Sequence, residues 1–175
     1  MGGKVNVTAV RHALSQLNTM TPAEFVQLTG PIFEHSPWIA ERTAPMRPFP
    51  TVETLHAAMC GNVTGATIEE QLALIRAHPD LVGRAVLTAE SVGEQVAAGL
   101  TNLSSEDVAL FDRYNREYKT RFGFPFVICA RQNKKDAILA SFPIRLQNNA
   151  DTERDTALRE IFKIARLRLD DLIQT

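Results

Sequence analysis

Cysteine is scarce in this sequence, because Cys60 and Cys129 are the only two among 175 residues. Their isolation excludes the paired spacings of a zinc site or of a CxxC redox site. Both are therefore predicted to be small buried residues of a protein kept in a reducing compartment. We expect a cytoplasmic protein that binds no metal.

Long apolar runs and a basic excess are also lacking. No run approaches the roughly 18 residues that a membrane-spanning helix requires, and residues 1–7 lack the apolar core of a signal peptide. The 19 Lys and Arg against 20 Asp and Glu give a formal net charge of −1. A general binder of nucleic-acid phosphates needs a basic excess. The sequence therefore predicts neither a membrane segment nor a nucleic-acid partner.

The sequence does contain an ordinary globular composition and a strong helical pattern. Hydrophobic residues make up 45% and charged residues 22% of the chain, as in typical soluble domains, and its length suits one domain, residues 1–175. Helices are predicted over residues 7–17, 21–32, 36–42, 52–59, 68–75, 88–99, 104–120, 136–146 and 152–173. The fold class is therefore predicted as all-α, a single-domain multi-helix bundle of about eight to nine helices.

His78 follows the helix predicted over residues 68–75, and Pro79 disfavours helical geometry at His78. An extended histidine at this helix end would feel the negative end of the helix dipole, which favours the imidazolium form. The plain alternative is a polar helix stop without a function, and for an isolated His-Pro pair this is the commoner outcome.

Two helices carry polar residues on faces that should be apolar. Arg168 lies within a stripe formed by Ile161, Ala165 and Leu172. A buried arginine is costly unless it meets an anion or a carboxylate, whereas an arginine at a domain edge can reach solvent by snorkelling. The spacing leaves both readings open. Asn115 lies among aromatic residues of the helix over 104–120, where it either braces a loop, the commoner role, or touches a ligand.

Glu94 has two possible roles that depend on where its helix begins. If Ser91 is the N-cap, Glu94 completes a capping box and merely accepts the backbone N–H of Ser91. If the helix begins at Thr88, Glu94 falls on the second turn and can face a pocket. The local sequence favours the capping box.

Residues 122–130 form a segment too apolar for a surface loop, while Gly123 and Pro125 disfavour a helix there. A buried non-regular segment has backbone N–H and C=O groups that need partners. A bound ligand can supply them, but an ordinary extended crossover is the simpler interpretation.

In combination these motifs resemble those of one family, the 2-oxo-4-hydroxy-4-carboxy-5-ureidoimidazoline (OHCU) decarboxylases of urate degradation. The resemblance covers most of the chain and rests on Glu34-His35-Ser36-Pro37-Trp38, on Ala77-His78-Pro79-Asp80-Leu81-Val82-Gly83, on Leu87-Thr88-Ala89-Glu90-Ser91 with Glu94-Gln95, on Asn115 and Tyr118-Lys119, on residues 122–130 and on Leu167-Arg168-Leu169. The His-Pro-Asp-Leu and Phe-Gly-Phe-Pro-Phe-Val elements are highly specific when they occur together.

The resemblance implies an all-α carboxy-lyase without a cofactor, usually a homodimer, that converts OHCU to (S)-allantoin. It assigns catalytic roles to His78, Glu94 and Arg168. The substrate-contacting segments that it implies comprise Pro79, Ser91, Val92, Gly93, Glu94, Gln95, Phe126, Val127, Ile128, Cys129 and Ala130.

The residue types suit such chemistry. Loss of CO₂ leaves an electron pair that the substrate ring can delocalise, and the protein must orient the substrate and deliver a proton. The hypothesis is that His78 donates the proton, which its unperturbed pKa near 6.5 suits. Arg168 would bind a substrate oxygen through its fork, and Glu94 would orient the substrate nitrogens or His78.

Two alternatives to an enzyme stay open. A non-catalytic helical module that binds a ureide or purine metabolite would retain the pocket without turnover. An interaction domain would instead show a large exposed apolar patch and no pocket lined by His78 and Arg168.

Overall fold

The two ends of the described chain lie side by side in the computed structural model, which describes residues 11–83 and 87–174. The elements in this part of the chain are β1 (His12–Ala13), α1 (Leu14–Thr19), α2 (Pro22–Thr29), η1 (Gly30–Ile32), α3 (Trp38–Thr43), η2 (Ala44–Met46), α4 (Val52–Thr64), α5 (Ile68–Arg76), α6 (Ala89–Ala97), α7 (Ser105–Phe122), η3 (Ala130–Gln132), α8 (Lys135–Arg145), α9 (Ala150–Leu172) and β2 (Ile173–Gln174). Within these residues the prediction of an all-α fold is confirmed.

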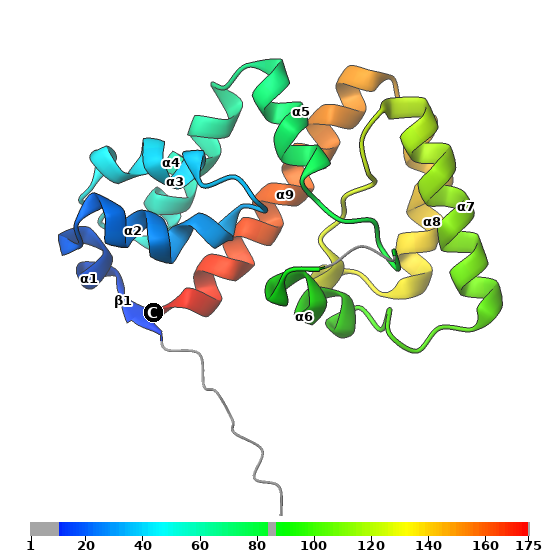
Figure 1. Ribbon diagram of the computed structural model, residues 1–175, viewed down its shortest axis with the longest axis horizontal. Coiled ribbons are helices and arrows are strands. Elements are labelled where there is room, and N and C mark those ends of the chain that lie inside the picture. Colours follow the sequence, from blue (N-terminus) through cyan, green and yellow to red (C-terminus); the bar gives the residue numbers. More distant parts are fainter. Residues whose placement is uncertain (1–10, 84–86, 175) are drawn as a thin grey trace, which may run out of the picture.

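The long helix α9 runs through the middle of the molecule (Figure 1). Helices α1 to α4 lie on one side of it and α6 to α8 on the other. α4, α5 and η1 all contact α9 directly. Because both groups of helices border α9, its polar residues can meet residues from distant parts of the sequence.

The helix starts follow local capping chemistry. Thr21 and Glu24 form a capping box in which the backbone N–H of Thr21 donates to Glu24 at 2.8 Å. Thr67 and Glu70 repeat the arrangement at 2.9 Å. Each box satisfies backbone groups that a helix start would otherwise leave unpaired, so both predicted starts are confirmed.

Two predicted helix boundaries are wrong. α4 does not stop before Gly61 but continues to Thr64 and ends at Gly65. A Cβ at Gly61 would meet nothing within 4 Å, so this glycine costs the helix only its usual roughly 1 kcal/mol. Of the helix predicted over 7–17, residues 7–10 lie outside the described residues, and the described part contains β1 before α1 starts at Leu14.

A small parallel strand pair, which the sequence pattern did not indicate, joins β1 to β2. His12 is paired with Ile173 and Ala13 with Gln174. The Gln174 side chain also donates to the carbonyl of Arg11 at 3.2 Å. This contact fixes the end of α9 against the beginning of the described chain.

A buried network of polar side chains connects residues 122–130 to α8 and α9. Arg145 of α8 pairs with the fully buried Glu153 of α9 at 2.5 Å, and Tyr118 donates its hydroxyl to the same carboxylate. Arg145 also donates to the carbonyl of Val127 at 2.6 Å. The apolar segment is therefore buried and non-regular, as predicted, with its backbone tied to two helices.

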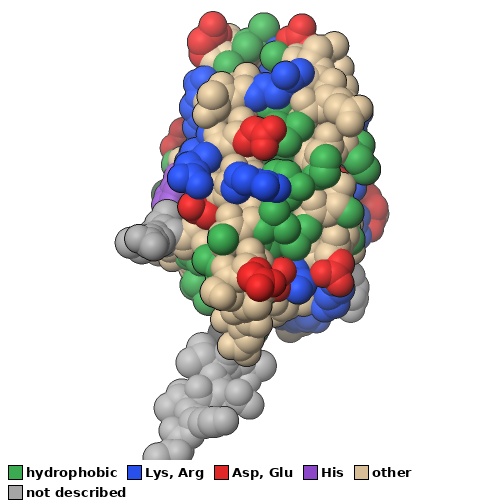
Figure 2. Space-filling view, turned by 90° about the vertical axis from the view of Figure 1, so that its right-hand side faces the viewer, with side chains coloured by type: hydrophobic (Ala, Val, Ile, Leu, Met, Phe, Trp, Pro, Cys, Tyr) green, Lys and Arg blue, Asp and Glu red, His purple; other side chains and the backbone are tan. Residues whose placement is uncertain are grey.

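None of the helices among residues 11–83 and 87–174 is long and apolar enough to cross a membrane. One face, at the α7 side, shows apolar side chains gathered in a strip between basic and acidic ones (Figure 2).

Candidate active site

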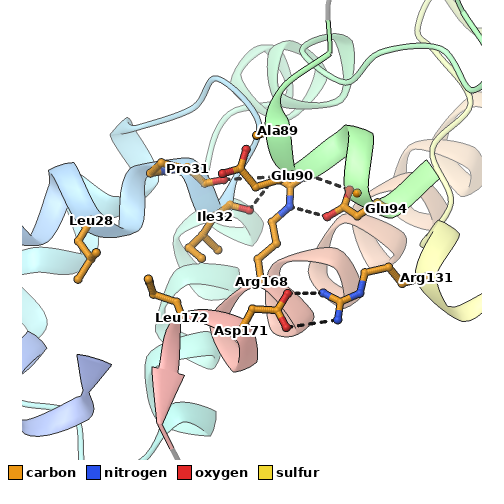
Figure 3. Close-up of a pocket in the computed structure, with 11 residues that line it drawn as sticks. Leu28, Pro31, Ile32, Ala89, Glu90, Glu94, Arg131, Arg168, Asp171 and Leu172 are labelled. Atoms are coloured by element: carbon orange, nitrogen blue, oxygen red, sulfur yellow. Dashed lines mark hydrogen bonds and ion pairs between the residues drawn. The ribbon is translucent and has the colours of Figure 1, made fainter. Parts of the chain in front are cut away.

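Arg168 of α9 is buried, with 6% of its surface exposed. Its Nε donates to Oε1 of Glu94 at 2.7 Å and its Nη2 to Oε2 of the same carboxylate at 3.0 Å (Figure 3). This bidentate geometry is the strongest form of an arginine–carboxylate pair. The snorkelling interpretation of Arg168 is therefore wrong, because its guanidinium meets a carboxylate inside the protein.

The remaining donors of Arg168 are also engaged. Nη2 donates to Oε2 of Glu34 at 3.0 Å, and Nη1 donates to the carbonyls of Pro31 and Ile32 at 3.2 and 3.4 Å. Burial lowers the pKa of Arg168, but the hydrogen bonds and charges of Glu94 and Glu34 outweigh burial and raise it. The guanidinium is thus a fixed positive charge between two carboxylates.

Glu94 reaches Arg168 because α6 has its N-cap at Thr88, three residues before the N-cap at Ser91 that the local sequence favoured. The N-cap is Thr88, whose hydroxyl accepts the backbone N–H of Ser91 at 3.2 Å. The predicted capping box at Ser91 is therefore wrong, and Glu94 lies on the second turn. From there its side chain, 12% exposed, faces α9.

His78 lies just beyond the end of α5, and its ring is held by that helix. Nδ1 is 2.9 Å from the carbonyl oxygen of Leu74. Because a carbonyl can only accept, Nδ1 carries a proton, and the neutral ring has its unprotonated nitrogen at Nε2. His78 is 8% exposed and lines a cavity together with Glu94.

The ring of His78 is uncharged, although the end of α5 favours its imidazolium form. Burial lowers the pKa of His78 to about 4, although the Leu74 carbonyl and the negative charge of Glu34 both raise it. The positive charge of Arg168 lowers it further. The helix end does favour the charged ring, as its dipole should, but desolvation is the larger effect. His78 is neutral at pH 7.

Two cavities meet at Glu94. The inner cavity, of about 30 Å³, is lined by His78, Pro79, Leu81, Ser91, Glu94, Gln95, Phe126, Val127, Ile128, Ala130 and Ile164. The outer cavity, of about 540 Å³, is lined by Leu28, Pro31, Ile32, Ala89, Glu90, Gly93, Glu94, Arg131, Arg168, Asp171 and Leu172. The outer cavity is larger, but the candidate proton-transfer group lies on the inner one. Glu94 borders both, so the ion pair with Arg168 lies at the wall between them.

The structure brings most of the predicted site residues to these cavities. His78 and Glu94 line the inner cavity, and Glu94 and Arg168 the outer one. The predicted substrate-contacting residues on the inner cavity are Pro79, Ser91, Glu94, Gln95, Phe126, Val127, Ile128 and Ala130. Gly93 lines the outer cavity. Val92 and Cys129 line neither, because Val92 is 45% exposed and the Cys129 N–H donates to Glu160 at 2.8 Å.

The segment that lines the inner cavity presents unused backbone donors. No hydrogen bond within the described residues uses the N–H of Phe126, Val127 or Ile128. All three residues are at least nine-tenths buried. Buried N–H groups need partners, and these three are suited to the oxygens of a ligand.

The loop that carries His78 is braced from α6 and α7. Asn115 donates to the carbonyl of Leu81 at 2.8 Å, so its role is the bracing one. The N–H of Val82 donates to Gln95 at 3.2 Å, and Val82 has a positive φ of 58°. A non-glycine residue in this region is strained, so these hydrogen bonds hold a conformation that the loop would otherwise leave.

Glu34 belongs to the site but was not among the predicted catalytic or substrate-contacting residues. It is 2% exposed and accepts hydrogen bonds from Thr88 at 2.9 Å and from Ser91 at 3.2 Å, besides the one from Arg168. Its only sequence signal was its place in the motif Glu34-His35-Ser36-Pro37-Trp38. In the described part of the chain, no group of three or more His, Cys, Asp or Glu residues is arranged to hold a metal ion.

Comparison with known proteins places the chain in a family. The profile of the OHCU decarboxylase family matches residues 18–170. The chain is 45% identical over 156 residues to the 2-oxo-4-hydroxy-4-carboxy-5-ureidoimidazoline decarboxylase of Haloferax volcanii, covering 89% of this chain and 93% of that protein. The chain belongs to the OHCU decarboxylase family. Its identity to the decarboxylase of Amia calva is 43% over 165 residues, covering 92% of this chain and 94% of the other.

Solved structures share the fold of this family member. A crystal structure of (S)-allantoin synthase aligns with a TM-score of 0.77 and 29% identity, over 93% of this chain and 54% of the other. A structure of OHCU decarboxylase in the presence of (S)-allantoin aligns with a TM-score of 0.66 over 77% of this chain and 89% of the other. At 24% identity the latter comparison speaks for the fold alone.

Proposed function

We propose that this chain is a carboxy-lyase that decarboxylates OHCU to (S)-allantoin in urate degradation. The observation that carries the proposal is the meeting of His78, Glu94 and Arg168 at two adjoining cavities, in a chain of the OHCU decarboxylase family. These residues come from three separate segments of the chain. Burying charged and polar side chains together is costly, so a core without a binding function would not be expected to contain them.

The substrate's own structure supplies the electron sink. Its name places a hydroxyl and a carboxylate on ring carbon C4 and the ureido group on C5, and an imidazoline ring retains one carbon–nitrogen double bond. As the bond between C4 and CO₂ breaks, its electron pair moves through C5 to the ring nitrogen, which takes a proton. The resulting enol becomes allantoin when the 4-hydroxyl loses its proton and C5 gains one. The reaction therefore consumes one proton and needs a second proton moved between neighbouring atoms.

His78 is suited to move that second proton. At neutral pH its ring is uncharged, with Nδ1–H bonded to Leu74, so it does not begin the reaction as the proton donor of the original hypothesis. Its Nε2 instead accepts the proton of the 4-hydroxyl and returns it to one face of C5. General acid–base catalysis by a placed histidine contributes about 10²–10⁴-fold, and delivery to one face yields a single enantiomer.

The other groups hold the substrate for this transfer. The unused N–H groups of Phe126, Val127 and Ile128 bind its carbonyl oxygens. Glu94 turns to a ring or ureido N–H, and the fork of Arg168 that Glu94 occupies becomes available to a substrate oxygen. The inner cavity of about 30 Å³ is much smaller than the roughly 300–1,000 Å³ of small-molecule pockets, so this movement of Glu94 also makes room.

Three further expectations remain predictions. The chain acts without a cofactor, because the substrate ring delocalises the charge itself. It forms a homodimer, for which the apolar strip on the α7 side (Figure 2) is a candidate surface, and it is located in the cytoplasm. Size-exclusion chromatography with light scattering tests the homodimer.

The decisive experiment follows freshly generated OHCU optically in the presence of the purified protein, with CO₂ release measured in parallel. Accelerated decay, stoichiometric CO₂ and a circular dichroism signal of one allantoin enantiomer are expected. A protein that binds (S)-allantoin in calorimetry but does not accelerate the decay would instead be the non-catalytic ureide-binding module.

A further inference from the structure

The guanidinium of Arg168 is paired with two carboxylates, that of Glu94 and that of Glu34. Burial alone raises the pKa of Glu34, but the charge of Arg168 and the hydrogen bonds from Thr88 and Arg168 lower it more. Glu34 is therefore ionised. Thr88 is the N-cap of α6, so the carboxylate also lies at a helix end that favours negative charge.

The two carboxylates on Arg168 differ in their freedom to move. Glu34 is 2% exposed, and both of its oxygens accept hydrogen bonds, from Thr88 and Ser91 as well as from Arg168. The carboxylate of Glu94 has no hydrogen-bond partner besides Arg168 among the described residues, and Glu94 borders both cavities. Glu34 is thus held by three residues and Glu94 by one.

This difference matters when the site takes its ligand. Moving Glu94 off Arg168 would leave a buried guanidinium without a counter-charge if no second carboxylate were present, and such an unpaired charge is strongly unfavourable. Glu34, together with the carbonyls of Pro31 and Ile32, keeps Arg168 paired and in place while Glu94 moves.

We propose that Glu34 is a positioning residue, the permanent counter-ion of Arg168 that allows Glu94 to exchange its partner for the substrate. This inference rests on the proposed decarboxylase function. It assigns the two carboxylates different roles, with Glu94 in contact with the ligand and Glu34 acting only through Arg168.

The test is the variant Glu34→Gln, which keeps an oxygen for Thr88 and Ser91 but removes the charge. Arg168 then depends on Glu94, and binding must break that pair. We expect the KM for OHCU and the calorimetric Kd for (S)-allantoin to rise about 10–100-fold, the value of one charge-assisted hydrogen bond, with a smaller change in kcat. The control is Val63→Ala in α4, a fully buried site outside both cavities, which lowers Tm without changing KM or Kd.

Unchanged KM and Kd in Glu34→Gln, with an active wild-type protein, would overturn this inference alone. A wild-type protein that releases no CO₂ from OHCU would overturn the proposed function and this inference with it. If Glu34→Gln does not fold, Glu94→Gln serves instead, because Arg168 should then keep Glu34 as its counter-ion and the protein should retain a Tm close to that of the wild type. A large loss of Tm in Glu94→Gln, as expected for a buried guanidinium left without a counter-charge, would equally overturn the inference.

Discussion

Glu94 and Arg168 are 74 positions apart in the chain, yet their side chains form a two-pronged ion pair at 2.7 and 3.0 Å. The pair connects the second turn of α6 to α9, and it lies where the two cavities meet. Its position makes both the stability of this region and the access to His78 depend on the same contact.

The variant His78→Asn should fold normally and lose about 10²–10⁴-fold in turnover, the usual contribution of a general acid–base group. An amide can donate to the Leu74 carbonyl but cannot move a proton between two substrate atoms. Optical decay of OHCU measures the loss, and circular dichroism shows whether the allantoin product becomes racemic.

The matched control for this variant is His56→Asn. His56 lies on α4, and its ring nitrogen is hydrogen-bonded to the Phe162 carbonyl at 2.8 Å, without lining either cavity. It should leave turnover near that of the wild type. Equal losses in both histidine variants would remove His78 from the mechanism.

Replacing Arg168 by lysine should lower both activity and stability. An ammonium has three donors and no planar fork, whereas Arg168 serves two carboxylates and two carbonyls. We expect a loss of about 1–3 kcal/mol in the free energy of unfolding from buried acceptors left unpaired, together with a higher KM. Urea unfolding and steady-state kinetics measure the two effects.

Arg166→Lys is the control, because Arg166 lies on the same helix but forms its ion pairs with Glu53 and Asp170 in partly solvent-exposed positions. Such pairs are worth about 0–1 kcal/mol. Full activity in Arg168→Lys would contradict the role of the guanidinium fork.

Stability should fall between pH 6.5 and about 4 because of His78. The unfolded chain binds a proton there with an ordinary pKa near 6.5, whereas the folded protein does so only at about 4. The unfolded state therefore holds more protons in this window, and folding loses up to about 3 kcal/mol as the pH falls through it. Unfolding measured at pH 7, 6, 5 and 4 tests this, because His78→Asn should show a flatter pH dependence than the wild type. Parallel curves for the two proteins would contradict the low pKa of His78.

Asn115→Leu should weaken the site without touching the substrate. It leaves the buried Leu81 carbonyl without the hydrogen bond from the asparagine, at a cost of about 1–3 kcal/mol, and loosens the loop that begins at His78. Both Tm and turnover should fall. Asn62→Leu, which removes a 2.9 Å hydrogen bond to Thr43, is the control and should lower Tm alone.

Much of the helical fold could be predicted because its signals are local. Thr21 and Thr67 each lie three residues before a glutamate, and the capping boxes form there as expected. The helix end predicted before Gly61 is wrong, because α4 continues to Thr64. The roughly 1 kcal/mol preference against a helical glycine is smaller than the packing of Met59 and Val63, which α4 buries completely.

The candidate site could be predicted only in part. Arg168 stood out because a charge interrupts an apolar stripe with helical spacing. Glu34 follows η1 in a connection without periodicity, and its partners are 54 to 134 positions away, so nothing local distinguishes it. The uncharged state of His78 could not be predicted for a related reason, because a helix end is visible in the sequence whereas burial by distant residues such as Phe126 is not.

The strand pair between β1 and β2 brings the first and last described residues together, since His12 and Ala13 pair with Ile173 and Gln174 and the Gln174 side chain donates to the Arg11 carbonyl. Because residues 11 and 174 are close to each other, the segment between them can be rejoined there by a short linker and reopened at a surface turn. Reopening at residues 65–66, between α4 and α5, would reorder the segments that carry Glu34, Glu94 and Arg168 along the polypeptide. All three side chains would still converge, because their meeting depends on how the helices pack around α9 and not on the order in which they are translated.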